Sequence, residues 1–281
     1  MSADDGHLPA TSLPARWSRI SALLLRHYYI LRSSPARVID IMFWPAVQMV
    51  LWGFISRFFA QRVGADMSTL DYALGTLLGA VLLWDLLFRT QIAVFIAYLE
   101  EIWARNLGHM FISPLRPFEW WTSMVLFSFF RVGVGLAPAV LLAIPFYGFS
   151  IFDLGLPLVA FFINLMMMGW WLGFFIIALL VRAGPGAEGL AWAITFLLAP
   201  FCAVYYPVDT LPAWLQPIAL SLPATHVFEG LRALVDTKTF EISHMLIALG
   251  LNLFYLMLAL GALTLALRAA RRAGSLLQSG E

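Results

Sequence analysis

The stretch LGLPLVAFFINLMMMGWWLGFFIIALLV, residues 154–181, contains no charged side chain. A helix needs roughly 20 consecutive apolar residues to cross a bilayer, and this stretch is longer than that. Backbone groups in hydrocarbon must be hydrogen-bonded within their own segment, and the run is too long and too uniformly apolar for a strand of a membrane barrel. The stretch therefore predicts a membrane-spanning helix.

The rest of the chain repeats this pattern. Hydrophobic residues make up 62% of the 281 positions and charged residues only 12%, whereas a soluble domain would carry roughly a quarter. The fold class we expect is all-α, a polytopic membrane protein with six transmembrane helices. Those helices cover residues 38–60, 72–99, 118–143, 154–181, 190–203 and 240–267. The fifth run is short unless its end is extended to Pro207.

Two of the expected spans carry a GxxxG motif. Gly75 and Gly79 form one, and Gly169 and Gly173 form the other. Small residues at this spacing allow two helix backbones to approach closely. We therefore expect close helix contacts at both places.

The chain divides into four segments by composition. Residues 1–13 are polar and predict a disordered N-terminus. Residues 14–37 alternate basic and apolar residues at helical spacing, typical of an amphipathic helix in the membrane interface, with a solvated basic leader as the alternative. Residues 38–267 form the six-helix transmembrane domain, and residues 268–281 a basic tail. Most of the 17 basic residues fall on the side of the termini, which predicts that both termini are cytoplasmic.

The charged residues and the single cysteine exclude several functions. A net charge of +1 gives no field that would attract nucleic acid. Cys202 is alone, so no intrachain disulfide and no cysteine-rich metal cluster can form. The only lysine, Lys238, follows Thr237, whereas a phosphate-binding P-loop needs Gly-Lys-Ser/Thr. The chain therefore cannot hold ATP in such a loop.

Three charged residues lie within the expected spans. Asp85 and Arg89 are four positions apart on one helix face, and Arg131 lies in the third span. Charges in hydrocarbon are expensive, so we expect Asp85 and Arg89 to pair with each other and to face the protein interior. The three residues either line a substrate path or lock helices together.

A second unusual region covers residues 205–236, YYPVDTLPAWLQPIALSLPATHVFEGLRALVD. Four prolines interrupt it, so we expect short helices that enter the membrane from outside and return. Within it His226, Glu229 and Arg232 are spaced three apart and share a broad helix face. This trio is either a metal or acid–base site or a polar network that stabilises a gate. With no HExxH motif and no other nearby His or Cys, we expect no metal.

Two stretches resemble a known family. The first is EEIWARNLGHMFISPLR, residues 100–116, a short amphipathic segment between two spans that contains Glu100-Glu101, Arg105-Asn106-Leu107 and Ser113-Pro114 and is followed by Pro117. The second contains Tyr206-Pro207, Leu211-Pro212-Ala213-Trp214-Leu215-Gln216, Leu222-Pro223, His226, Glu229 and Arg232. Together they are similar to the coupling helix and the re-entrant helices of the membrane permeases of type-2 ABC exporters.

The resemblance implies a half-transporter in the bacterial inner membrane, with no catalytic residue and no cofactor of its own. Two copies, or one copy and a related permease, would pair in the lipid bilayer. Each would engage a separate ABC ATPase that binds ATP and magnesium. The residues it assigns to ATPase coupling are Glu100, Glu101, Ile102, Trp103, Arg105, Asn106 and Leu107. The residues it assigns to the extracytoplasmic gate are Pro207, Leu211, Pro212, Trp214, His226, Glu229 and Arg232.

Two expectations attach to the coupling residues. The carboxylates of Glu100 and Glu101 would pair with basic residues of the ATPase, with an ordinary solvated helix end as the alternative. Ile102, Trp103 and Leu107 would supply an apolar docking face, or would simply anchor the chain at the membrane interface.

Two other classes of function stay open from the residues alone. An ion-coupled secondary transporter would need more internal carboxylates and an inverted repeat, and neither is visible. A polytopic membrane transferase would need a convergent cluster of His, Asp or Glu. His226 and Glu229 are its only serious candidates.

Overall fold

The computed structural model describes residues 13–63 and 67–273, and in those residues every regular element is a helix. The α-helices are α1 (Leu13–Arg32), α2 (Pro35–Val63), α3 (Met67–Trp103), α4 (Leu107–Ile112), α5 (Pro117–Tyr147), α6 (Pro157–Ala183), α7 (Glu188–Leu198), α8 (Gln216–Leu220), α9 (Pro223–Thr237) and α10 (Ile242–Ala273). Three short 3-10 helices join them, η1 (Ile151–Leu154), η2 (Pro185–Ala187) and η3 (Val208–Thr210). The expected disordered N-terminus lies, apart from Leu13, outside the described residues.

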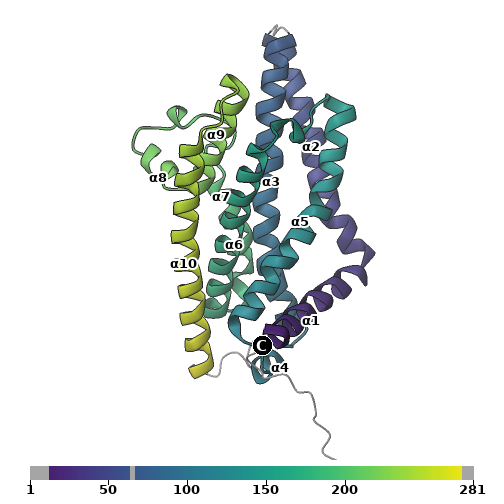
Figure 1. Cartoon of the computed structure of the whole chain (residues 1–281), viewed down its shortest axis with the longest axis vertical. Helices are drawn as coiled ribbons and strands as arrows, with labels where there is room; N and C mark the ends of the chain where they lie inside the picture. The colour runs from purple at the N-terminus through teal and green to yellow at the C-terminus, as the bar shows by residue number, and fades with distance from the viewer. Residues whose placement is uncertain (1–12, 64–66, 274–281) are drawn as a thin grey trace, which may run out of the picture.

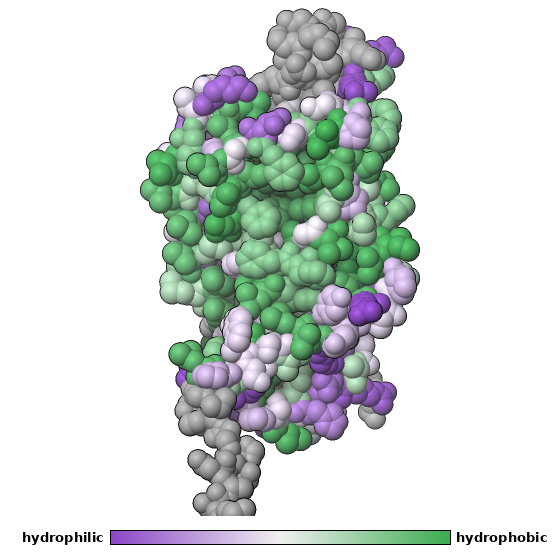
Figure 2. Space-filling view, turned by 45° about the vertical axis from the view of Figure 1, so that its right-hand side comes forward, coloured by the Kyte–Doolittle hydropathy of each residue, from purple (hydrophilic) through white to green (hydrophobic). Residues whose placement is uncertain are grey.

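Five helices, α2, α3, α5, α6 and α10, are long and apolar enough to cross a membrane. They run side by side along the long axis of the molecule (Figure 1). Their outer side chains form a broad apolar band between two more polar ends (Figure 2). The all-α, multi-pass character predicted from the apolar runs is therefore confirmed.

The expected span at residues 190–203 is not one long helix. It coincides with α7, which has 11 residues and is therefore only about 16 Å long, against about 30 Å of hydrocarbon. The helix α7 ends at Leu198, although Ala199, the residue before Pro200, still has helical dihedral angles (φ −53°, ψ −46°). Ala203 then adopts a positive φ of 49°, which turns the chain away from the helix axis.

The helices α3 and α6 form the centre of the bundle. Their most apolar windows are 83% and 78% buried, whereas those of α2, α5 and α10 are 22–28% buried. A Cβ atom on Gly169 or Gly173 would lie 2.6 Å from the side chain of Thr90 or Val94. The GxxxG motif in α6 therefore allows α3 and α6 to touch, as predicted. Gly75 and Gly79 face α9 in the same way, with side-chain atoms 3.7 and 3.5 Å away.

Several helix boundaries differ from the expected ones. The amphipathic helix ends at Arg32, and α2 begins at Pro35. The last helix continues to Ala273, so the first part of the expected basic tail is helical, and residues 274–281 lie outside the described residues. The α1 helix, α4 and the C-terminal end of α10 lie at one end of the bundle (Figure 1), which we call the α4 end.

Candidate functional site

The segment between α3 and α5 folds as a tight turn followed by α4. Arg105 adopts a positive φ of 53° between the two helices. The start of α5 is fixed by Pro117 in its first turn and by Glu119, whose Oε2 atom accepts the amide of Arg116 at 2.9 Å. The turn at Arg105 thus fixes the backbone before α4, and the capping contact of Glu119 fixes the backbone after it.

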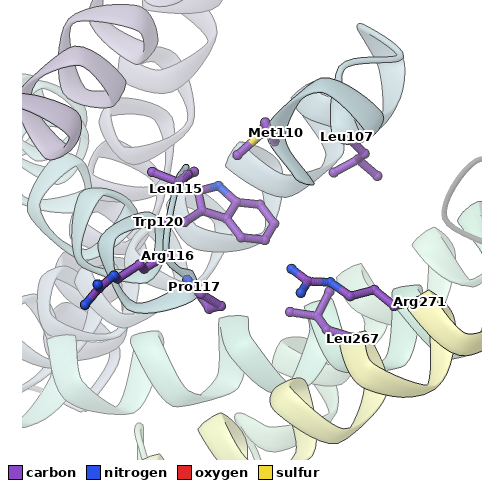
Figure 3. A pocket seen from close by; sticks show the side chains of 8 residues that line it. All are labelled: Leu107, Met110, Leu115, Arg116, Pro117, Trp120, Leu267 and Arg271. Carbon is purple, nitrogen blue, oxygen red and sulfur yellow. The ribbon is translucent and has the colours of Figure 1, made fainter. Parts of the chain in front are cut away.

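Packing buries one side of α4. Leu107 and Met110 lie beside Trp120 of α5 and Leu267 of α10, around a cavity of about 20 Å³ (Figure 3). Ile102 and Leu107 are buried, and their expected part in an apolar docking face stays a prediction. Among the described side chains of the segment, the large apolar ones that are exposed are Trp103, which is 55% exposed, and Ile112, which is 86% exposed.

Glu100 and Glu101 turn inward. The fully buried carboxylate of Glu101 forms an ion pair with Arg26 of α1 and accepts a hydrogen bond from Asn106 Nδ2 at 2.7 Å. The Glu100 carboxylate lies 3.4 Å from the Arg37 guanidinium. The expected ion pairs with an ATPase stay a prediction, and in this structure the carboxylate of Glu101 is paired within the chain and has no exposed surface.

The other flank of α4 is held by α1 in the same manner. Arg19 donates from Nε and Nη2 to the two carboxylate oxygens of Glu119, at 2.9 and 2.6 Å. Arg19 and Arg26 are two helical turns apart, so they share one face of α1. This helix thus ties the end of α3 to the start of α5.

His27, the residue after Arg26 on α1, is buried where α1 packs against α5. Its ring stacks on Phe127 of α5, with centroids 5.2 Å apart, and the residue is 1% exposed. Burial lowers the pKa of His27 to about 4, and the charges of Arg26 and Arg131 act in the same direction. The imidazole is therefore neutral at pH 7, although the Glu100 carboxylate lies 3.9 Å from its Nδ1 atom.

The predicted intramembrane charges meet at a partly open cavity of about 440 Å³. Its lining comes from α2, α3, α5 and α7 and consists of Asp40, Ile41, Trp44, Gln48, Asp85, Phe88, Arg89, Ile92, Ile96, Arg131, Trp192 and Phe196. The expected ion pair is present, because Arg89 Nε donates to Asp85 Oδ2 at 2.8 Å. Arg131 lines the same space but is paired with neither residue.

Towards the other end of the bundle, the predicted gate residues Glu229 and Arg232 form a polar network. Arg232 Nη2 donates to Glu229 Oε1 at 2.9 Å and to the carbonyl of Ala203 at 3.0 Å. Glu229 Oε1 also accepts the amide of Val208 at 2.9 Å. Helix breaks in apolar surroundings leave backbone groups without partners. This network satisfies two of them where the chain leaves α7.

The remaining predicted gate residues do not converge. Pro207 and Leu211 flank η3, Pro212 is exposed, and Trp214 is 72% exposed. His226 is buried, and its Nε2–H donates to the carbonyl of Leu220 at 2.9 Å.

His226 nevertheless has a histidine neighbour, so the expectation of no other histidine nearby is wrong. Its Nδ1 lies 3.3 Å from Nδ1 of His244 in α10. Within the described ranges, no group of three or more His, Cys, Asp or Glu side chains could hold a metal ion. The pair therefore joins α9 to α10 rather than completing such a cluster.

Sequence reasoning missed several residues of these regions, and one of them had a visible signal. Glu119 follows Pro117 at the spacing of a helix start, which predicts a capping carboxylate. The pairing of Arg19 with Glu119 and of His226 with His244 had no comparable signal, because each pair joins helices that are distant in sequence.

Two comparisons with known proteins bear on this arrangement. The family model described as ABC-2 type transporter matches residues 32–235, which is well over half of the chain and includes α2 to α9 almost entirely. No curated protein matches the chain.

Proposed function

The chain belongs to the ABC-2 type transporter family, whose permeases work with an ATPase on a separate subunit, and we propose that it is the membrane half of an ATP-driven exporter. The observation that carries the proposal is the placement of α4. It is a short helix held between the two long helices α3 and α5, and apolar side chains are exposed at Ile112 in α4 and at Trp103, the last residue of α3. We propose that α4 is where the ATPase docks.

The proposed docking surface differs from the one that the sequence suggested. It consists of Trp103, Arg105, His109 and Ile112, all of which are exposed. Force applied there would reach α5 and α10 through the packing of Leu107 and Met110. It would reach α1 through the ion pairs of Glu101 and Glu119. In this proposal Glu101 and Glu119 transmit movement within the permease and do not bind the ATPase directly.

We propose that α7 and α9 together make the sixth crossing. Trp192 and Phe196 of α7 lie beside Phe95 and Phe88 of α3, with ring centroids 5.3 and 5.2 Å apart. Further along α3, Phe228 of α9 lies beside Trp84, with centroids 6.4 Å apart.

Val235 of α9 then reaches Gly75, where a Cβ atom would lie 3.7 Å from it. Both short helices run antiparallel to α3, and α8 lies between them in sequence. Two half-helices of this kind would span the bilayer and would leave the intervening segment as the re-entrant part.

Six crossings place both described ends on one side of the membrane. The basic residues favour the cytoplasm for that side, in the inner membrane of a bacterial cell. The cavity at Asp85 and Arg89 would form part of the cargo path, facing a second permease copy. A membrane transferase is less well supported, since His226 and Glu229 bind different partners instead of one shared site.

The test is co-purification with the ABC ATPase subunit from membranes that contain both chains. Ile112→Glu places a charge on the proposed docking surface and should reduce the bound ATPase at least about tenfold, because an apolar contact residue becomes charged. Leu13→Glu, at a comparably exposed position on α1, serves as the matched control and should retain the ATPase. Undiminished ATPase binding and transport by Ile112→Glu, or transport without any ATPase, would contradict the proposal.

A further inference from the structure

Two carboxylates and two guanidinium groups line the cavity, but only one ion pair forms among these four side chains. Asp85 and Arg89 neutralise each other across 2.8 Å, and each of these side chains is about 10% exposed. Asp40, the other carboxylate of the lining, is exposed. Arg131 forms no ion pair with any carboxylate of the described residues, since the nearby Glu100 is held by Arg37. One guanidinium therefore faces the cavity without a neutralising partner in contact.

The rest of the lining is apolar and aromatic. Trp44, Phe88, Trp192 and Phe196 supply ring faces, and Ile92 and Ile96 supply aliphatic surface. A volume of about 440 Å³ lies within the range of sites that enclose a small molecule, roughly 300–1,000 Å³. The planar guanidinium fork matches the oxygens of a carboxylate or a phosphate. A ligand with one acidic end and an apolar body would suit this lining.

The position of Arg131 in the bundle agrees with such a ligand. Arg131 lies one helical turn beyond Phe127, the residue that stacks on His27 of α1. The α1 helix has the pattern of a helix that lies in the membrane interface. Arg131 is close to the middle of α5, so an acidic head group held there would lie within the bundle, one turn beyond the contact between α1 and α5.

We infer that the cavity binds amphiphiles whose head carries a phosphate or a carboxylate, with Arg131 as the residue that binds the head. This inference rests on the proposed function, because it names the chemical class of the cargo. The acidic head can come from two sources, the anionic lipid of the surrounding bilayer or the exported molecule. Asp40 stands at the same cavity, and its carboxylate disfavours a second acidic group there.

The experiment uses the purified full chain in nanodiscs of phosphatidylcholine. Energy transfer from tryptophan to a dansyl-labelled dodecyl chain reports binding, and the chain carries either a phosphate or an uncharged maltoside head. The phosphate probe should bind about tenfold or more tightly, the usual effect of one charge-assisted hydrogen-bonded contact. Equal binding of the two probes to the unaltered protein would overturn the inference.

Three variants test the residue. Arg131→Gln should bring the two probes within about twofold of each other, while Arg131→Lys should keep only part of the preference, because it keeps the charge but lacks the planar fork. Arg182→Gln, which removes an exposed guanidinium of α6 outside the cavity lining, is the matched control and should keep the preference for phosphate. If Arg131→Gln does not fold, the reduced preference expected of Arg131→Lys relative to Arg182→Gln is the test, and an undiminished preference in Arg131→Lys would contradict the inference. A preference for the phosphate probe that persists in Arg131→Gln would contradict the inference.

Competition separates the sources of the head group. Phosphatidylglycerol in the nanodisc should displace the probe far less well than an equal amount of the unlabelled phosphate amphiphile. Equal displacement would make the cavity a site for bulk lipid and would overturn its role in cargo selection. Inorganic phosphate at millimolar concentration should not compete, and competition by it would show that the apolar chain contributes nothing.

Because these assays contain neither ATPase nor ATP, their failure leaves the docking of the ATPase on α4 untouched. Conversely, loss of the ATPase in the co-purification test leaves the measured head-group preference unchanged.

Discussion

Arg19 of α1 and Glu119 of α5 form a two-point ion pair, with nitrogen–oxygen distances of 2.9 and 2.6 Å. The same carboxylate also accepts the amide of Arg116, so a single side chain joins α1 to the residues that follow α4. Planar two-point contacts of this kind fix geometry as well as charge. The amphipathic helix is therefore attached to the segment that we propose as the ATPase docking site.

The first prediction concerns this attachment. Glu119→Gln should lower the midpoint of thermal unfolding in detergent by a few degrees and should weaken the stimulation of the ATPase by the permease, because α1 no longer follows α5. Arg19→Gln should have the same effect, and the double variant should be little worse than either single one. Arg32→Gln, at an exposed end of α1, is the control. Fully additive losses would show that the two residues act independently.

The second prediction concerns the ion pair in the cavity. Asp85→Asn leaves Arg89 without its carboxylate, and Arg89→Gln leaves Asp85 without its guanidinium. Removing one partner of a buried pair costs about 3–5 kcal/mol, whereas removing both costs much less. The double variant should therefore be more stable in thermal unfolding than either single variant. The opposite order would mean that each residue has a separate partner.

The third prediction concerns the contact between α3 and α6. Gly173→Ala would place a Cβ atom 2.6 Å from Val94 Cβ and 3.2 Å from the Gln91 carbonyl oxygen. Overpacking of this kind costs about 1–3 kcal/mol, and it should appear as a lower midpoint of thermal unfolding. Gly261→Ala in α10 meets nothing within 4 Å and should be neutral or slightly stabilising. Equal behaviour of the two variants would contradict the close approach.

The fourth prediction concerns pH. The pKa of His27 is lowered by burial from 6.5 to about 4, so between these values the unfolded chain binds a proton that the folded protein does not. The contribution of His27 to stability is therefore complete above about pH 6.5 and is lost as the pH falls towards 4. The loss amounts to about 3 kcal/mol at most.

The measurement for His27 is the midpoint of thermal unfolding from pH 7.5 to 4.5, compared with His27→Phe. The variant keeps an aromatic ring against Phe127 but cannot titrate, so it should lose less stability on acidification. Parallel curves for the two proteins would show that His27 does not sense pH.

The long spans could be predicted because each is decided by its own residues. An apolar run such as residues 154–181 has one stable arrangement in a bilayer, and hydropathy alone identifies it. The run at residues 190–203 has similar hydropathy but stops short after Leu198. What makes the break tolerable is Arg232, which donates to the Ala203 carbonyl from 29 positions further along the chain. No local sequence pattern predicts that contact.

The site residues were predicted by type better than by role. Amphipathic spacing placed Glu101, Ile102 and Leu107 at the end of a span, but it could not say which side of the segment other helices would cover. The partner of Glu101 is Arg26, on a helix that the pattern treated as separate. The ion pair of Asp85 and Arg89 could be predicted more easily, because two opposite charges four positions apart in an apolar helix have few other charged groups to pair with.

The length of α10 has a consequence for how motion could travel. It runs unbroken from Ile242 to Ala273, it touches the surroundings of α4 through Leu267, and near its other end His244 meets His226 of α9. One continuous helix therefore connects the surroundings of α4 at one end of the bundle with the contact between His226 and His244 towards the other end. A displacement of α4 would therefore be transmitted along α10 to α9 without crossing a break in the helix.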